Sequence, residues 1–409
     1  MKKLDVRFTR SPGEEQTVGV LAEDHGRVYF EYNSEFLADG YSLSPFRVPF
    51  EQGLFEHRDH SFGPLPGLFD DSLPDGWGLL LMDRHFRSIG QSLAETSPLD
   101  RLSWLGTRTM GALTYHPPAD IAATERSVFD LHDLARHSQQ ILSGAAVEVL
   151  PVLLRAGGSP GGARPKVLVG YNPKTNELRS GEDDLPDGFE HWMVKFAAEM
   201  DGAEAGAIEY AYALMAADAG IDMPPARLFE TAEGDRFFGI KRFDREGNRR
   251  FHVHTFGNLI HSNFRVPSAD YGDLLKATSM LTRNHREVLR AFRRLVFNVL
   301  AHNRDDHVKN FAFKLDDSTG YWSMTPAYDL LWTSGPGGEH TMTVAREGRR
   351  PNREHVSRLA EEAGIARRDV DAVLLEARDA VSRWNQHAER AGITKATAQH
   401  IADGLCSLD

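Results

Sequence analysis

Apolar and polar residues alternate in short runs over the first fifty positions, and this pattern predicts β-strands. Such alternation places apolar side chains on one face of a strand, and it occurs at residues 4–8, 18–22 and 27–32. The chain then predicts a turn that opens an amphipathic helix at 73–82, a helix at about 98–105 and a strand at 110–115. We therefore expect an α+β subdomain over residues 1–117, which ends at the pair Pro117-Pro118.

The rest of the chain divides into a strand-rich part and a helical part. A linking helix is predicted within residues 118–150, and further elements follow as strands at 167–171, 191–196, 226–229 and 236–243 and a helix at 203–219. From about residue 270 helical spacing dominates, as over 288–301 and 370–384. The expected fold class is α+β, with the N-terminal subdomain followed by a bilobal domain: a strand-rich part over 151–245 and a largely helical lobe over 246–409.

Composition narrows the class of protein. Of the 409 residues, 41% are hydrophobic and 26% are charged, a balance typical of soluble globular proteins. No apolar run reaches the roughly 18 residues that a membrane-spanning helix needs. The single cysteine, Cys406, excludes an internal disulfide and fits a reducing cytoplasm. A net charge of -12 argues against nucleic acid bound by the chain as a whole, and the basic stretches at 283–294 and 346–353 are interpreted first as solvated surfaces.

An acidic loop over residues 303–310 carries the groups that phosphoryl transfer needs. Asp305 stands five positions before Asn310, and Asp329 follows 19 residues after it. One carboxylate can accept the proton of an incoming hydroxyl, while an amide oxygen and a second carboxylate hold magnesium. Protein kinases place their base and their magnesium-binding asparagine at the same offset. Asp305 is therefore the candidate base, and Asn310 and Asp329 are candidate magnesium ligands of an ATP-dependent kinase.

Two other interpretations of this loop stay open. Asp and Asn are common turn formers, so the loop could be no more than a polar connection. A metal-hydrolase cluster is also conceivable, because such sites use His and Asp ligands; its candidates are His302, Asp305, Asp306 and His307, with His252 and His254. That interpretation assigns no role to the lysine and the glycine-rich run described next.

Lys195 and a glycine-rich run are candidates for phosphate binding. Lys195 lies in a predicted strand, from which a lysine can reach ATP phosphates when a helix glutamate, here Glu209, orients it. The run has glycines that let backbone N–H groups approach phosphate, and cations that add positive charge: Gly157, Gly158, Gly161, Gly162, Arg164 and Lys166. Ser159 is expected to be an exposed hydroxyl. The plainer alternatives are an exposed strand lysine and a flexible turn.

Several motifs together resemble the HipA family, the serine/threonine kinase toxins of bacterial type II toxin–antitoxin systems. They lie at residues 159–166, 195–196, 242–245, 303–311 and 326–329, and the resemblance extends over almost the whole chain, including an N-terminal subdomain around residues 73–77. The resemblance implies a protein-kinase-like fold that uses ATP and Mg²⁺. It also implies that Asp305 is the catalytic aspartate and that Asn310 and Asp329 bind magnesium.

The same resemblance implies further site residues. Lys195 corresponds to the ATP-phosphate lysine, and the phosphate loop corresponds to Gly161, Gly162, Ala163, Arg164, Pro165 and Lys166. The hinge beside adenine corresponds to Lys241, Arg242 and Phe243, which would act mostly through the backbone. A second nucleotide-binding set comprises His307, Val308, Lys309, Asn310, Tyr328 and Asp329. Ser159 corresponds to a serine that family members phosphorylate on themselves, which would pull the loop from the cleft and stop ATP binding.

Partners follow from the resemblance too. It implies a small HipB-like DNA-binding antitoxin that carries the protein to operator DNA, and a protein substrate of the aminoacyl-tRNA synthetase type. Two alternatives remain: a small-molecule phosphotransferase of the aminoglycoside type, and a non-catalytic protein that binds an antitoxin and regulates transcription. The first gives no reason for Ser159 or for the N-terminal subdomain. The second predicts weak or absent ATP hydrolysis despite Asp305, Asn310 and Asp329.

Overall fold

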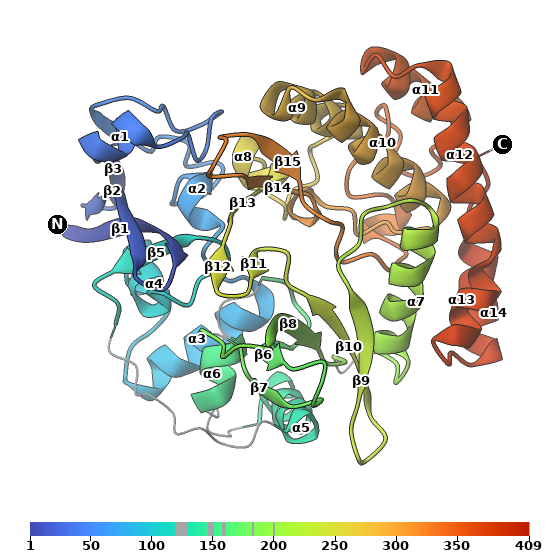
Figure 1. Cartoon of the computed structure of the whole chain (residues 1–409), viewed down its shortest axis with the longest axis horizontal. Helices are drawn as coiled ribbons and strands as arrows, with labels where there is room; N and C mark the ends of the chain where they lie inside the picture. The colour runs from blue at the N-terminus through green and yellow to red at the C-terminus, as the bar shows by residue number, and fades with distance from the viewer. Residues whose placement is uncertain (120–129, 146–150, 158–160, 182–183, 199–200, 409) are drawn as a thin grey trace. The chain divides into compact units, whose positions relative to one another are not determined.

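The computed structural model describes residues 1–119, 130–145, 151–157, 161–181, 184–198 and 201–408 (Figure 1). Its contacts divide the chain into two compact units. The first unit comprises residues 1–203, 229–254 and 315–320, and the second comprises 204–228, 255–314 and 321–409. The finer division expected at residues 117, 150 and 245 stays a prediction.

An antiparallel five-stranded sheet begins the first unit, in the order β4-β3-β2-β1-β5. Its strands are β1 (Lys2–Ser11), β2 (Glu14–Asp24), β3 (Arg27–Tyr32), β4 (Leu54–Glu56) and β5 (Leu113–His116). The alternation along β1 puts Leu4, Val6 and Phe8 in the core, and Leu4 pairs with Leu21 of β2. The strands predicted from this alternation are confirmed.

Four helices follow within the same unit: α1 (Ser34–Asp39), α2 (Gly67–Asp70), α3 (Gly76–Ser88) and α4 (Pro98–Leu105). Helix α4 begins where the sequence predicts. The Ser97 hydroxyl accepts a hydrogen bond from the Asp100 N–H, the Asp100 carboxylate accepts one from the Ser97 N–H, and Pro98 stands at the first helical position. These groups satisfy N–H donors that a helix start leaves without partners.

A second five-stranded sheet has the order β7-β6-β8-β10-β9. It contains β6 (Lys166–Tyr171), β7 (Leu178–Ser180), β8 (Glu190–Lys195), β9 (Ala226–Glu230) and β10 (Arg236–Lys241), and the short pair β11 (Arg245–Glu246) and β12 (Arg249–Arg250) follows. Helices α5 (Leu131–Leu142) and α6 (Pro151–Gly157) pack with α3 and this sheet around one core that includes Trp77, Leu153 and Trp192. The N-terminal subdomain and the second sheet therefore share a core within the first unit.

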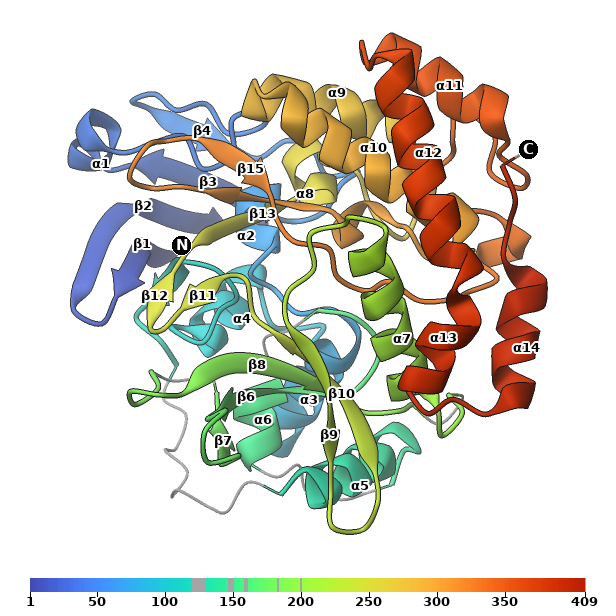
Figure 2. The same ribbon diagram turned by 45° about the vertical axis from the view of Figure 1, so that its right-hand side comes forward.

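The second unit is mostly helical, as predicted. Its helices are α7 (Ala205–Asp218), α8 (Phe256–Ile260), α9 (Tyr271–Thr282), α10 (His285–Leu300), α11 (Arg353–Glu362), α12 (Arg367–Ser382), α13 (Trp384–Arg390) and α14 (Lys395–Gly404). Helix α10 contacts α9 and α12, and α7 contacts α12 and α13, so these helices lie side by side in both views (Figure 1, Figure 2). Strands β14 (Ala312–Leu315) and β15 (Trp322–Met324) are neighbours in a small sheet, and β13 (His252–Thr255) lies almost wholly in the first unit.

The mixture of helices and sheets confirms the predicted α+β class. Two short 3₁₀ helices, η1 (Val308–Asn310) and η2 (Pro336–Gly338), have no counterpart among the predicted elements. Within the part of the chain that the structure describes, no helix is both long and apolar enough to span a bilayer.

Candidate active site

In the second unit, the loop between α10 and β14 closes on itself through the predicted pair Asp305 and Asn310. The side-chain amide nitrogen of Asn310 donates a hydrogen bond to the backbone carbonyl of Asp305 at 2.7 Å. This bond uses the amide nitrogen, whereas a metal ion would need the amide oxygen. His307 caps η1 by accepting a hydrogen bond from the Lys309 N–H at 3.2 Å, and the Asp305 side chain is exposed. The five-residue spacing thus forms a loop that brings the candidate base beside the candidate ligand.

The segment of the third predicted residue is tied to the same loop. The Tyr328 hydroxyl donates a hydrogen bond to the carbonyl of Lys309 at 2.7 Å, which places the residue before Asp329 against the residue before Asn310. Asp329 has φ 53°, in the left-handed region where Asp occurs more readily than most side chains. An amide oxygen and a carboxylate are hard oxygen ligands that suit Mg²⁺, which completes its shell with phosphate and water oxygens. The donor set fits magnesium, and ligation by Asn310 and Asp329 stays a prediction.

His307 and Lys309 also share an aromatic neighbour. The Phe264 ring lies 5.5 Å from the His307 ring, measured between centroids, and the Lys309 ammonium is 4.9 Å from the centre of the Phe264 ring. These contacts restrict two residues that are predicted to contact nucleotide. Val308 is buried and anchors η1 against α8.

Sequence reasoning missed the role of Asp306, which it placed only in a possible metal cluster. Its fully buried carboxylate accepts hydrogen bonds from the Tyr271 hydroxyl and from His340 Nδ1, both at 2.7 Å, and from the Thr341 N–H at 2.9 Å. The one sequence feature that could have pointed to this role is that Asp306 directly follows the candidate base. Its three donors lie 34 or 35 residues away in the chain, which spacing alone does not reveal.

In the first unit, the described part of the glycine-rich run is held by the turn that opens α3. The Gly162 N–H donates to the Asp75 carboxylate, the Trp77 N–H donates to the Gly162 carbonyl at 3.0 Å, and the Trp77 indole donates to the Lys166 carbonyl at 3.1 Å. Gly76 has φ +45°, and a Cβ there would lie 2.6 Å from the Gly162 carbonyl oxygen. Only glycine fits this close approach. The supporting role of residues 75–77 was not predicted.

Individual loop residues differ in what they already contact. The Lys166 ammonium donates to the Gly161 carbonyl, and the Arg164 guanidinium is paired with Asp201 at 2.9 Å. Ala163 is exposed. The Gly162 N–H is bonded to Asp75, so this donor would contact phosphate only after exchanging that partner. Ser159 lies outside the described residues, as does Gly158.

Lys195 is more buried than an ordinary strand lysine. Only 9% of Lys195 and 3% of Lys166 is exposed, and the two residues are direct cross-strand partners in β8 and β6. The Lys195 ammonium lies 5.7 Å from the centre of the Phe238 ring, and the Lys166 ammonium donates to the Gly161 carbonyl. Phosphate binding by Lys195 stays a prediction. Glu209 is buried on α7 of the second unit, and its predicted pairing with Lys195 stays a prediction.

The predicted hinge residues are largely engaged within the first unit. The Lys241 ammonium is paired with Glu190 at 2.7 Å, and the Arg242 guanidinium makes two hydrogen bonds, at 2.9 and 2.8 Å, with Asp244. The Arg242 N–H donates to the His191 carbonyl at 2.9 Å. The two side chains therefore have structural contacts, and an adenine contact would fall to Phe243 or to the remaining backbone groups.

The structure does not support the metal-hydrolase interpretation. Among the described residues, no group of three or more His, Cys, Asp or Glu side chains could hold a metal ion. His252 Nε2 contacts the Leu43 carbonyl at 2.8 Å, and His254 contacts Asp71 through Nδ1 at 2.5 Å and Ser44 through Nε2 at 3.0 Å. Asp71, His254 and Ser44 are arranged like a hydrolase triad. However, neither Ser44 nor His254 has exposed surface, so no substrate reaches the Ser44 hydroxyl.

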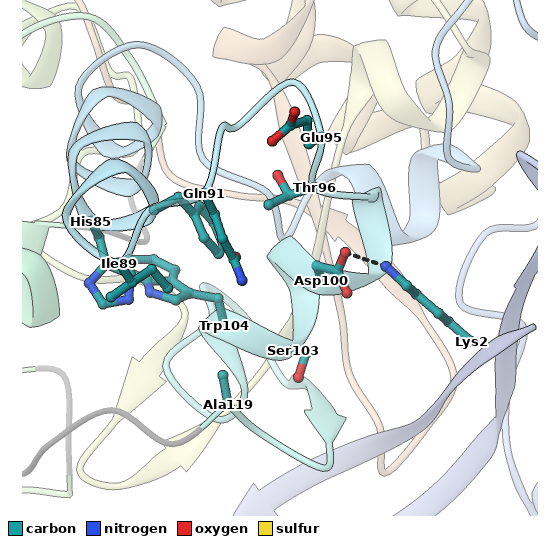
Figure 3. Close-up of a pocket in the computed structure, with 11 residues that line it drawn as sticks. Lys2, His85, Ile89, Gln91, Glu95, Thr96, Asp100, Ser103, Trp104 and Ala119 are labelled. Atoms are coloured by element: carbon teal, nitrogen blue, oxygen red, sulfur yellow. Dashed lines mark hydrogen bonds and ion pairs between the residues drawn. The ribbon is translucent and has the colours of Figure 1, made fainter.

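A surface pocket of about 570 Å³ lies elsewhere in the first unit (Figure 3). Figure 3 shows the Lys2–Asp100 ion pair on one side of it and the rings of His85 and Trp104 on the other. None of its lining residues belongs to the predicted site. This pocket and the predicted phosphoryl-transfer chemistry are therefore separate features.

The chain matches two domains of one known family. Residues 13–116 match the HipA N-terminal domain, and residues 158–385 match the HipA-like C-terminal domain. A Sinorhizobium fredii (strain NBRC 101917 / NGR234) protein named "Putative kinase Y4dM" is 25% identical over 99% of this chain and 96% of its own length. A second, "Putative kinase Y4mE" of the same strain, is 26% identical over 47% of this chain and 50% of its own length.

Among solved structures, the HipA of Shewanella oneidensis MR-1, determined with HipB and operator DNA, has a TM-score of 0.70 to this chain. The two are 16% identical, and the match covers 98% of this chain and 94% of that one. At this identity the likeness is one of fold, and it confirms the predicted fold class.

Proposed function

This chain belongs to the HipA family, and on that premise we propose that it is an ATP- and Mg²⁺-dependent serine/threonine protein kinase. It acts as the toxin of a bacterial toxin–antitoxin pair in the cytoplasm. Its relatives carry names that describe them as putative kinases, which supports the general activity.

The observation that carries the proposal is the hydrogen bond from the Asn310 side chain to the Asp305 carbonyl at 2.7 Å. This bond links the proposed base to the proposed metal ligand, and the two residues stand at the offset that protein kinases use. The Tyr328–Lys309 hydrogen bond supports the same assignment, because it joins the segment of Asp329 to this loop.

Each residue of the proposed site has one role in phosphoryl transfer from ATP. The Asp305 carboxylate accepts the proton of a serine or threonine hydroxyl while the hydroxyl oxygen bonds to the γ-phosphorus and the bond to ADP breaks. Asn310 and Asp329 hold Mg²⁺, which when bound neutralises charge on the phosphates. In the first unit, Lys195 and the loop 161–166 bind phosphate. The buried cross-strand pair of Lys166 and Lys195 supports that assignment.

A HipB-like antitoxin is the proposed partner. The similar Shewanella oneidensis HipA was solved with HipB and operator DNA, which supports such an assembly here. The net charge of -12 favours DNA contact mainly through the antitoxin. The proposed substrate is a translation factor such as an aminoacyl-tRNA synthetase, and Ser159 is the proposed site of autophosphorylation.

The test uses purified protein with labelled ATP and Mg²⁺, followed by mapping of phosphate by mass spectrometry. Label on Ser159 that disappears in Asp305→Asn supports the proposal. Label only on added aminoglycosides would indicate the small-molecule phosphotransferase instead. If no label forms but a small helix-turn-helix protein binds tightly, the non-catalytic alternative holds. Ser159→Ala should keep its activity longer than the wild type, because a phosphoserine would add about 1.5 to 2 negative charges to the phosphate loop.

A further inference from the structure

We propose that Asp306 is a positioning residue that fixes the orientation of Asp305 by tying the catalytic loop to residues 338–349. The inference rests on the proposed function, because it assumes that Asp305 is the base. Asp306 itself would not touch substrate, since its side chain has no exposed surface.

Three donors surround the Asp306 carboxylate. Oδ2 accepts from the Tyr271 hydroxyl and from His340 Nδ1, both at 2.7 Å, and Oδ1 accepts from the Thr341 N–H at 2.9 Å. The three donors come from α9 and from the chain after η2. A buried carboxylate with both oxygens bonded in this way holds a single rotamer.

A row of side chains orients the Tyr271 hydroxyl. The Asn298 amide donates to this hydroxyl at 2.9 Å, and the Asn298 side-chain oxygen accepts from the Asn303 amide at 3.0 Å. Because the hydroxyl oxygen accepts from Asn298, its proton is directed to Asp306. Burial, followed by the charge of Asp306, raises the pKa of Tyr271 well above its usual value, so the hydroxyl remains a donor.

Arg304, the other neighbour of Asp305, is bound to the same region. Its carbonyl accepts from the Thr341 N–H at 3.1 Å and from the Thr341 hydroxyl at 3.0 Å. Its guanidinium donates to the carbonyls of Gly338 and Arg349. The residues on both sides of Asp305 are thus bound to the same segment, while the Asp305 side chain is exposed.

This arrangement fixes the base without burying it. A general base must lie within hydrogen-bond reach of the proton that it removes, and a misplacement of about 1 Å can reduce the rate roughly 100-fold. A loop anchored only at its ends would not hold that geometry. The contacts of Arg304 and Asp306 supply anchors at the two positions next to the base.

The test compares Tyr271→Phe with Tyr212→Phe. Both tyrosines are fully buried in the second unit. The Tyr271 hydroxyl donates to Asp306, and the Tyr212 hydroxyl donates to the Ala301 carbonyl, both at 2.7 Å. Tyr271→Phe should lower the urea midpoint at least as much as Tyr212→Phe, because it removes a bond to a carboxylate and also the acceptor of the Asn298 amide. Only Tyr271→Phe should lower kcat, by about tenfold or more, with the KM for ATP within about twofold of the wild type. Amide exchange at Thr341 should quicken in that variant alone.

The outcomes separate the two claims. Equal kcat in the two variants, with transfer by the wild type intact, overturns the positioning role and leaves the kinase assignment standing. An increase in KM with unchanged kcat also overturns it, because that would place Tyr271 in substrate binding. Absence of transfer by the wild-type protein overturns the proposed function itself. Asp306→Asn should reproduce the loss of kcat where it folds, and the tyrosine pair decides the question where it does not.

Discussion

Replacement of Asp244 by asparagine should destabilise the first unit strongly, although the change keeps shape and volume. The Asp244 carboxylate accepts two hydrogen bonds from Arg242, one from Arg245 at 2.6 Å and one from the Gly111 N–H at 2.8 Å. The side chains of Arg242, Asp244 and Arg245 are only 3%, 4% and 5% exposed. Asparagine would leave two buried guanidinium groups without their anion.

The size of the effect follows from burial. Removal of one partner from a buried ion pair costs about 3–5 kcal/mol, because an uncompensated charge remains in the interior. Asp317→Asn is the matched control: its carboxylate is also nearly buried and also meets two arginines, Arg10 at 2.7 Å and Arg249 at 3.0 Å. Those arginines are 33% and 44% exposed, and water can solvate them, so we expect a loss of about 1 kcal/mol or less.

Both variants and the wild type are unfolded in urea at several pH values between 5 and 8, and far-ultraviolet circular dichroism monitors the unfolding. The two arginines hold the pKa of Asp244 far below its usual value against the opposing effect of burial. A carboxyl whose folded pKa is depressed stabilises the protein above its unfolded pKa of about 3.9, and this stability is lost only as the pH falls through the folded pKa. The difference between Asp244→Asn and the wild type should therefore stay constant over this range. Equal losses in the two variants, or a loss under 1 kcal/mol for Asp244→Asn, would refute the reasoning.

Three further outcomes are expected. Asp305→Asn should lower phosphoryl transfer by roughly 100-fold or more and should shift the unfolding free energy by less than about 0.5 kcal/mol, since its side chain is exposed; a destabilised protein would indicate a structural role instead. Burial lowers the pKa of His191 and of His252 to about 4, so both side chains are neutral in the folded state between pH 7 and pH 5. Acidification over this range should lower the free energy of unfolding by roughly 2 kcal/mol for each histidine, because only the unfolded chain takes up the protons. A flat pH profile of urea midpoints would contradict this. Gly76→Ala should weaken ATP binding measured by calorimetry. The control is Gly90→Ala, beyond the other end of α3, where φ is +77° and a Cβ would meet nothing within 4 Å, so this change should cost only backbone strain. Equal affinities of the two variants for ATP would show that the contact of Gly76 with Gly162 does not matter.

The sequence predicts the helices and strands for one set of physical reasons and the candidate reacting groups for another. The strands of the first sheet follow from alternation, because Leu4, Val6 and Phe8 must share one buried face. Helix α4 follows from local chemistry, since Ser97, Pro98 and Asp100 together start a helix. The pair Asp305 and Asn310 was recognisable because one loop supplies both groups at fixed spacing.

What the sequence did not reveal are contacts between distant segments. Residues 73–77 were recognised as part of the N-terminal subdomain, but nothing in their pattern shows that Asp75 and Trp77 hold the glycine-rich run. The family resemblance assigns Lys241 and Arg242 to the hinge. Their ion pairs with Glu190 and Asp244 depend on the register of β8 against β10 and on the turn after β10, which tertiary packing decides.

The two candidate loops are held according to one physical requirement. An irregular loop leaves backbone groups that need partners, and in each unit one bond between a carboxylate and a backbone N–H ties the loop to a distant segment. The loop supplies the N–H in the first unit and the carboxylate in the second. Asp75 binds Gly162 across 87 residues, and Asp306 binds Thr341 across 35 residues. Since Asp75 and Trp77 belong to the first unit together with Gly162, the N-terminal subdomain is part of the support of the predicted phosphate loop and does more than precede it. The boundary between the segments that match the two HipA domains, at residues 116 and 158, therefore separates stretches of sequence without separating the contacts on which the loop depends.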